Sequence, residues 1–306
     1  MTTDILCLGE PMLEFNQQPD GNYKPGHGGD TSNAACAAAR QGAKVGYFTL
    51  LGEDTFGNSF VEMWNREGVD ASSVKRVSTA PTAVYFVTHG PNGHEFSYFR
   101  AGSAASTMSP ADLPKEALES TRILHVSGIS QAISATAADA VFAAIETVKA
   151  AGGTVSYDTN LRLKLWPLTR ARAVIHEGIS QCDIALPGLD DALHLTGLKD
   201  PDAIVDVYLG LGAKVVALTL GAKGALVATP DTRELIAGRK ADAVDATGAG
   251  DTFDGAFLAR IAAGDDPFAA AHYANAAAAL ATQGYGAVEP MPYRKDVEAF
   301  LAANQA

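Results

Sequence analysis

"GGDTSNAACAAARQGAKVGYFTLLGEDTFG", from Gly28 to Gly57, combines a helix, a strand and the start of a second helix in one short segment. The small-residue run before Gly42 predicts a helix that ends at this glycine. The apolar run 44–51 then predicts a buried strand. Asp54 stands where the N-cap of the next helix is expected, and Gly68 stands where that helix should stop. Such close alternation of helix and strand is typical of an α/β fold.

The same alternation continues along most of the chain. Further apolar runs of strand length lie at 4–9, 122–128, 154–158, 183–187 and 214–220. Helical patterns separate many of them, and the part from 250 to 303 is helical with an alanine-rich centre. We therefore predict a central, mostly parallel sheet with helices on both faces. A length of 306 residues is enough for one large domain of this kind or two smaller ones.

Two stretches depart from this rhythm and predict a small antiparallel flap. The aromatic and β-branched runs 82–90 and 94–100 are separated by Pro91-Asn92-Gly93, which indicates a hairpin. A second turn-rich β candidate occupies 12–26. We expect both pieces to lie on one edge of the α/β body.

The composition excludes several classes of protein. A net charge of −12 argues against general nucleic-acid binding, which needs a basic surface. The sequence contains no run of about 18 apolar residues, so no membrane span is expected. The N-terminus lacks the basic flank of a signal peptide. Three widely spaced cysteines, Cys7, Cys36 and Cys182, fit free buried thiols in a reducing cytoplasm.

"DATGAGDTF", from Asp245 to Phe253, is the first candidate for chemistry. Apolar spacing after it predicts a helix that begins near Gly250, so its glycines lie at a helix N-terminus that attracts anions. A carboxylate there would repel phosphate unless it takes a proton from a hydroxyl that attacks the phosphate, which makes Asp251 a candidate base. The alternative is an aspartate that only complements the helix dipole.

A second candidate is the loop that enters the helix of the opening segment. Asp30 and Asn33 lie three residues apart and could face one cleft, where they would offer hydrogen bonds to sugar hydroxyls. Helix capping by Asp30 is the alternative.

Taken together, these segments resemble the two signatures of the ribokinase-like (PfkB) carbohydrate kinase family. "GGDTSNAA" and "GEDTFG" are similar to the N-terminal signature, and "DATGAGD" to the C-terminal one, with Ala246 where threonine is usual. "GEPMLEF", "YFRAGSAAS", "HVSGIS" and "DTNLRLKLW" resemble the branch of 2-keto-3-deoxygluconate kinases. The resemblance implies a single ribokinase-like domain over 1–306, with a β lid from about 10–26 and 82–100. It also implies ATP-dependent phosphorylation of a sugar-acid hydroxyl, with Mg²⁺ as cofactor.

The resemblance also implies roles for individual residues. Asp251 would be the catalytic base, and the backbone of Gly248, Ala249 and Gly250 would form the anion hole. The sugar side would be formed by Gly29, Asn33, Tyr85, Tyr98, Arg100 and Arg162. Because arginine pairs well with carboxylates, Arg100 and Arg162 are expected to bind the acid group. The alternatives are ordinary surface arginines and tyrosines that pack in the core.

The signals on the nucleotide side are less specific. "TLGAKGALVA" resembles the family's nucleotide loop, with Thr219, Gly221 and Gly224 matching, although a plain turn between two strands is the alternative. Asn275 matches a position beside the adenine, or is a helix asparagine satisfied internally. Gly188 stands where the family has an asparagine, and Asp191 stands where it has a glutamate. Asp191 is the expected magnesium residue and could act through a water molecule.

Three rival functions follow from the same residues. One is a kinase of fructose, ribose or 2-keto-3-deoxygalactonate, and another is a non-catalytic ligand-binding protein on this fold. A nicotinamide oxidoreductase is disfavoured because no GxGxxG follows the first strand. An open lid edge makes a homo-oligomer plausible.

Overall fold

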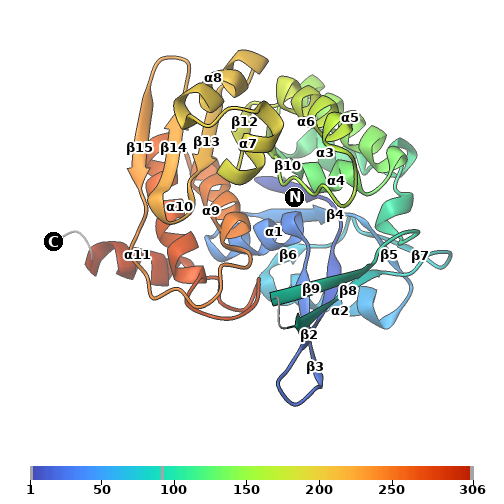
Figure 1. The fold of residues 1–306 in the computed structure, drawn as a ribbon. Helices are drawn as coiled ribbons and strands as arrows, with labels where there is room; N and C mark the ends of the chain where they lie inside the picture. The colour runs from blue at the N-terminus through green and yellow to red at the C-terminus, as the bar shows by residue number, and fades with distance from the viewer. Residues whose placement is uncertain (1–2, 91–92, 304–306) are drawn as a thin grey trace.

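A nine-stranded sheet forms the centre of the molecule in the computed structural model, which describes residues 3–90 and 93–303. Its strand order is β15-β14-β13-β12-β11-β10-β1-β4-β6 (Figure 1). The strands of this sheet from β1 to β13 run parallel to one another, whereas β14 runs antiparallel to β13 and β15 runs antiparallel to β14. The strands are β1 (Ile5–Leu8), β4 (Val45–Phe48), β6 (Val69–Asp70), β10 (Ile123–Ser127), β11 (Thr154–Asp158), β12 (Ile184–Leu186), β13 (Val215–Thr219), β14 (Gly224–Ala228) and β15 (Arg233–Ala237). The predicted mostly parallel sheet is therefore confirmed.

The strand order reverses at β1, and this reversal decides where a ligand can bind. The chain first adds β4 and β6 on one side of β1, and then adds β10 to β15 on the other side. Connections after neighbouring strands therefore leave in opposite directions and open a crevice at the carboxyl ends. The segments that follow β11, β12 and β13 carry Arg162, Asp191 and Gly221, and all three residues line one cleft.

Helices cover both faces of the sheet because alternate residues of each strand point to opposite faces. Ile5 and Cys7 belong to one buried cluster, whereas Leu6 and Leu8 belong to the other. The first face is covered by α1 (Asp30–Arg40), α2 (Thr55–Glu67), α9 (Ala249–Ala263), α10 (Pro267–Ala281) and α11 (Arg294–Ala303). The second face is covered by α3 (Lys115–Ser120), α4 (Gly128–Ala132), α5 (Ala135–Ala150), α6 (Leu168–Gln181), α7 (Leu189–Thr196) and α8 (Pro201–Leu211).

The signals that predicted helix ends act as expected. The Asp54 carboxylate accepts a hydrogen bond from the Gly57 N–H at 2.7 Å and caps α2, which ends at Gly68 in the left-handed conformation. Helix α1 ends at Arg40, and Gly42 follows with a φ of 92°.

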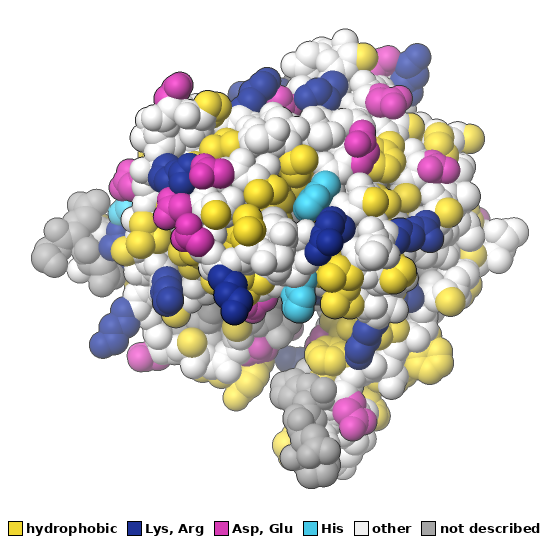
Figure 2. Space-filling model, turned by 45° about the horizontal axis from the view of Figure 1, so that its top comes forward, with side chains coloured by type: hydrophobic (Ala, Val, Ile, Leu, Met, Phe, Trp, Pro, Cys, Tyr) yellow, Lys and Arg dark blue, Asp and Glu magenta, His cyan; other side chains and the backbone are white. Residues whose placement is uncertain are grey.

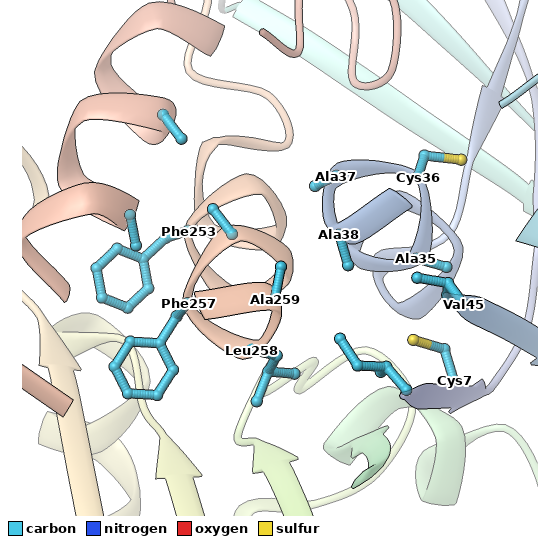
Figure 3. Packing of buried hydrophobic residues seen from close by; sticks show 14 of the residues in the cluster. Cys7, Ala35, Cys36, Ala37, Ala38, Val45, Phe253, Phe257, Leu258 and Ala259 are labelled. Carbon is cyan, nitrogen blue, oxygen red and sulfur yellow. The ribbon is translucent and has the colours of Figure 1, made fainter. Parts of the chain in front are cut away.

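Small residues allow α1 and α9 to pack closely. A Cβ on Gly255 would lie 2.3 Å from the carbonyl oxygen of Ala34, so the contact requires glycine. Figure 3 shows the alanines of α1 beside α9, with Phe253 and Phe257 pointing away from α1. This close contact brings the starts of both helices to the same crevice.

The flap predicted from 10–26 and 82–100 forms a four-stranded sheet of order β3-β2-β8-β9, which we call the lid (Figure 1). Its strands are β2 (Met12–Gln17), β3 (Tyr23–Gly28), β8 (Ala83–Gly90) and β9 (Gly93–Phe99). Both hairpins are antiparallel, but they join through a parallel pairing of β2 with β8, which the hairpin signals did not predict. Pro91 and Asn92 of the predicted turn lie outside the described residues.

The remaining short elements are a two-stranded sheet of β5 (Leu50–Gly52) and β7 (Lys75–Val77), and 3-10 turns at Ala105–Thr107, Pro110–Asp112 and Gly221–Lys223. Cys7, Cys36 and Cys182 are buried free thiols, as the sequence predicts. Across the described part of the chain, no helix combines the length and the apolar character that crossing a membrane requires.

Candidate active site

A cleft of about 2330 Å³ lies between the lid and the carboxyl edge of the main sheet. Its walls come from the segments that follow β1, β11, β12 and β13, from the start of α9, and from the lid strands. Among the predicted site residues, those lining the cleft are Gly29, Asn33, Tyr85, Tyr98, Arg100, Arg162, Asp191, Thr219, Gly221, Gly248, Gly250 and Asp251. The fold therefore gathers most of the predicted residues around one cavity.

The start of α9 is shaped by its glycines. Gly248 caps the helix with a φ of 73°, and a Cβ there would lie 3.0 Å from the backbone of Ala287. Apart from its own helix backbone and chain neighbours, no described atom lies within 4 Å of the position a Cβ on Gly250 would take, and Gly250 lines the cleft, so this side of the helix start is open. The Ala249 N–H, predicted to be part of the anion hole, donates to the Ala246 carbonyl at 3.1 Å. The Ala249 N–H is therefore already hydrogen-bonded at this helix start.

Asp251 lies in the first turn of α9 and faces the start of α1. Its Oδ2 accepts a hydrogen bond from the Asn33 side-chain amide at 2.8 Å. Burial, together with the nearby Asp30 carboxylate, raises the pKa of Asp251 to about 7. The Asn33 hydrogen bond and the Arg162 charge act in the opposite direction and keep that pKa from rising further. Such a carboxylate is poised to exchange a proton near neutral pH.

Further buried carboxylates surround Asp251, and sequence reasoning missed two of them. Asp158 ends β11 and Asp254 lies one helical turn after Asp251. Burial and then the neighbouring carboxylates raise the pKa of both groups. Asp30 does not cap α1, because Gly29 is the N-cap residue and no side chain bonds there. Its carboxylate instead accepts a hydrogen bond from the Asn160 amide at 3.1 Å.

Arg100 is not an ordinary surface arginine. Its Nη2 forms an ion pair with Glu10, whose side chain is fully buried at the end of β1, and Glu10 also accepts from the Ser103 hydroxyl at 3.1 Å. Burial raises the pKa of Glu10, whereas Arg100 and Ser103 lower it. The Arg100 Nε is buried and has no hydrogen-bond partner among the described residues. Sequence reasoning missed Glu10, although a carboxylate directly after the first strand was a usable signal.

The two lid tyrosines face the cleft and each other. Their ring centroids lie 5.7 Å apart in a stacked arrangement, and Tyr98 is 40% exposed, so it is not a core residue. The Tyr85 hydroxyl donates to the Glu14 carboxylate at 2.5 Å. The guanidinium of Arg100 lies 5.8 Å from the Tyr98 ring centroid. A Cβ on Gly29 would lie 2.5 Å from the Glu10 carbonyl, and its φ of 113° also requires glycine.

Arg162 contrasts with Arg100 in its partners. It lies exposed at the cleft wall, and its Nη1 donates to the Leu161 carbonyl at 2.9 Å. No carboxylate of the described residues lies within ion-pair distance of it. Arg162 is therefore an exposed cation of the cleft without an ion-pair partner among the described residues.

The predicted nucleotide residues divide into two groups. Thr219 and Gly221 line the cleft at the end of β13. Gly224 pairs with Ala237 inside the sheet, and Asn275 is buried in α10, where its amide donates to the Ile236 carbonyl at 3.0 Å. Neither residue lines the cleft. The geometry thus favours the internal role for Asn275.

The residues present suit a metal that arrives with phosphates and not a resident metal centre. No group of three or more His, Cys, Asp or Glu side chains among the described residues could hold an ion by itself. Asp191 lines the cleft, but its Oδ2 accepts a hydrogen bond from the Leu161 N–H at 2.8 Å, and Gly188 offers no side-chain donor. Since Mg²⁺ keeps waters and needs only one or two carboxylates beside substrate phosphates, this set is compatible with it.

On the face shown in Figure 2, lysine and arginine side chains lie singly among acidic and neutral ones. They form no continuous basic surface on that face, in keeping with the net charge of −12.

Known proteins similar to this chain include several carbohydrate kinases. A profile of the pfkB family carbohydrate kinases matches residues 2–294. A 2-dehydro-3-deoxygluconokinase of Bacillus subtilis (strain 168) is 33% identical and the match covers 100% of this chain and 97% of that protein. One of Thermoproteus tenax is 34% identical over 98% and 94% of the two chains. Fructokinase-2 of Zea mays is 31% identical over 94% and 91%. The crystal structure of an E. coli protein described as ribokinase II, in complex with ATP and Mg²⁺, matches with a TM-score of 0.90 and 26% identity, and the match covers 99% of this chain and 100% of that one.

Proposed function

Because the chain belongs to the pfkB family of carbohydrate kinases, we propose that it transfers the γ-phosphoryl group of ATP to a hydroxyl of 2-keto-3-deoxygluconate, also named 2-dehydro-3-deoxygluconate. The observation that carries the proposal is the joint placement of Asp251 and Arg162 on one cleft, together with relatives of that name.

In this proposal Asp251 accepts the proton of the attacking hydroxyl. A pKa near 7 lets the carboxylate be largely ionised at slightly alkaline pH and still hold a proton after transfer. The Asn33 amide orients the carboxylate through its hydrogen bond, leaving Oδ1 for the substrate.

The start of α9 would stabilise the phosphoryl group in transfer. Gly248 caps this helix and Gly250 lies in its first turn beside open space, so the positive end of the helix dipole would face the negative charge of that group. Thr219 and Gly221 would border the nucleotide on the same edge. Mg²⁺, when bound with ATP, would shield the phosphate charge, and Asp191 is the residue that would meet it.

The acid group of the sugar would be recognised by Arg162, with Arg100 on the wall of the same cleft. Among the described residues Arg162 has no ion-pair partner, and the Nε of Arg100, which also lines the cleft, has no hydrogen-bond partner. The lid, with Tyr85 and Tyr98 facing inward, would cover the sugar and exclude water that could otherwise attack ATP. Buried free thiols fit work in a reducing cytoplasm.

Asp251→Asn tests the role of the base. We expect turnover to fall roughly 10²- to 10⁴-fold, while calorimetric affinity for the sugar acid changes little because the amide keeps the size and the Asn33 contact. Asp139→Asn, on the exposed side of α5, is the matched control for a lost carboxylate. An Asp251→Asn enzyme with the wild-type rate would remove Asp251 as the base.

A kinase of a neutral sugar such as fructose is the second candidate. Its support is the Glu10–Arg100 pair, which already balances one of the two arginine charges, and the similarity to a plant fructokinase. Arg162→Ala separates the two: a large rise in KM for the sugar acid supports the first, and an unchanged KM supports the second.

A further inference from the structure

The loop after β11, which leads to Arg162, contains a residue in an unusual conformation. Among the described residues, Asn160 is the one amino acid other than glycine with a positive φ, at 24°. Asparagine tolerates this region better than most residues, but the conformation still has a cost and persists only when its surroundings enforce it.

Three carboxylates from different elements enforce it. The Asn160 N–H donates to the Asp158 Oδ1 at 3.0 Å, at the end of β11. The Asn160 side-chain amide donates to the Asp30 Oδ2 at 3.1 Å, on α1. The Leu161 N–H donates to the Asp191 Oδ2 at 2.8 Å, on α7. These hydrogen bonds connect the loop to β11, to α1 and to α7.

The loop also packs closely against the start of α4. A Cβ on Gly128, the first residue of α4, would lie 2.2 Å from the Thr159 carbonyl. Asn160 itself is only 8% exposed, whereas Arg162, two residues on, is exposed to the cleft. The backbone of the loop is thus held by its contacts, and it sets the point from which the exposed Arg162 side chain extends.

We propose that Asn160 is a positioning residue for Arg162, acting through its contact with Asp30, and that Asp191 supports the same loop through the Leu161 N–H. This rests on the proposed function, because it takes Arg162 as the residue that binds the substrate carboxylate. Asn160 does not touch the reacting atoms. Its effect is to reduce the orientations that Arg162 must lose on binding.

The test is a double-mutant cycle of Asn160→Gly and Arg162→Ala, assayed with 2-keto-3-deoxygluconate and ATP. Glycine adopts a positive φ without strain, so this variant removes the side-chain contact and not the backbone conformation. We expect Arg162→Ala to raise the KM for the sugar acid roughly 10- to 100-fold, in the range of a charge-assisted pair. Asn160→Gly alone should raise it roughly 10-fold, with kcat and the KM for ATP changing less than about threefold.

The cycle decides between positioning and a general structural role. In the Arg162→Ala background, Asn160→Gly should change the KM by less than about twofold, because its target is gone. Equal effects in both backgrounds, or no effect in either, would overturn the inference while leaving the proposed function intact. An unchanged KM in Arg162→Ala alone would instead overturn the sugar-acid assignment.

Two further variants protect the test. Asn22→Gly makes the same chemical change in the exposed turn of the lid and should leave the KM unchanged. If Asn160→Gly does not fold, Asn160→Ser replaces it, since serine is too short to reach Asp30 and must then show the same coupling to Arg162.

Discussion

The Asp251 carboxylate should cost the folded protein stability, and the cost should depend on pH. Its pKa is raised from 3.8 to about 7 by burial and by Asp30. One pKa unit corresponds to about 1.36 kcal/mol, so the ionised group disfavours the folded state by up to about 4 kcal/mol. Asp251→Asn removes this cost and keeps an oxygen for the Asn33 amide.

The sign follows from proton binding. Below about pH 3.8 the group is protonated in both the folded and the unfolded chain, so the substitution changes little. Between pH 3.8 and about 7 the unfolded chain loses this proton while the folded chain keeps it, and wild-type stability falls relative to the variant. Above about pH 7 both states have lost the proton and the difference stays constant.

Urea unfolding at pH 5 and pH 8 measures this difference. The stability gain of Asp251→Asn should be about 1.5 kcal/mol at pH 5 and about 4 kcal/mol at pH 8. The control Asp139→Asn should give the same small difference at both pH values. A gain for Asp251→Asn that does not grow with pH would show that burial and Asp30 do not raise the pKa of this carboxylate.

Three other predictions follow from named contacts. The kcat/KM for the sugar acid should fall below about pH 7 as Asp251 is protonated, and Asn33→Ala should move this limb to higher pH because a hydrogen bond that lowers the pKa is lost; a midpoint near pH 4 would contradict this. Gly255→Ala should destabilise the protein by about 1–3 kcal/mol, seen as a lower Tm, because its Cβ would meet the α1 backbone at 2.3 Å. Gly210→Ala, in open space on α8, should be neutral or stabilising, and equal effects would count against the packing argument. The open edge of β9 predicts self-association through the lid, which Phe99→Lys should abolish in sedimentation velocity; a monomeric wild type would contradict it.

The regular part of the fold could be predicted from the sequence because its signals are local. Apolar runs, the Asp54 cap and the glycines at 42 and 68 report on their own neighbourhoods, and the structure confirms them. The parallel pairing of β2 with β8 joins segments about 70 residues apart, and no local pattern specifies it.

The candidate site shows the same division. Asp251 was found because a glycine-rich helix start marks it, and the structure places it on the cleft. Asp158 and Asp254 were missed because their importance lies in burial beside other charges, which only the folded chain reveals. Glu10 was missed although its place after the first strand was a usable signal; its ion pair with Arg100 depends on the fold. Asn275 has a family match, yet its amide is used by neighbouring carbonyls that no sequence pattern predicts.

An ADP-release assay across matched substrates decides whether this carbohydrate kinase acts on a sugar acid. The panel should hold 2-keto-3-deoxygluconate, its galacto epimer, fructose and ribose at equal ATP and Mg²⁺. We predict that kcat/KM for one of the two sugar acids exceeds that for either neutral sugar at least 10²-fold, and that Arg162→Ala removes most of this preference. A higher kcat/KM for fructose or ribose than for both acids would contradict the claim.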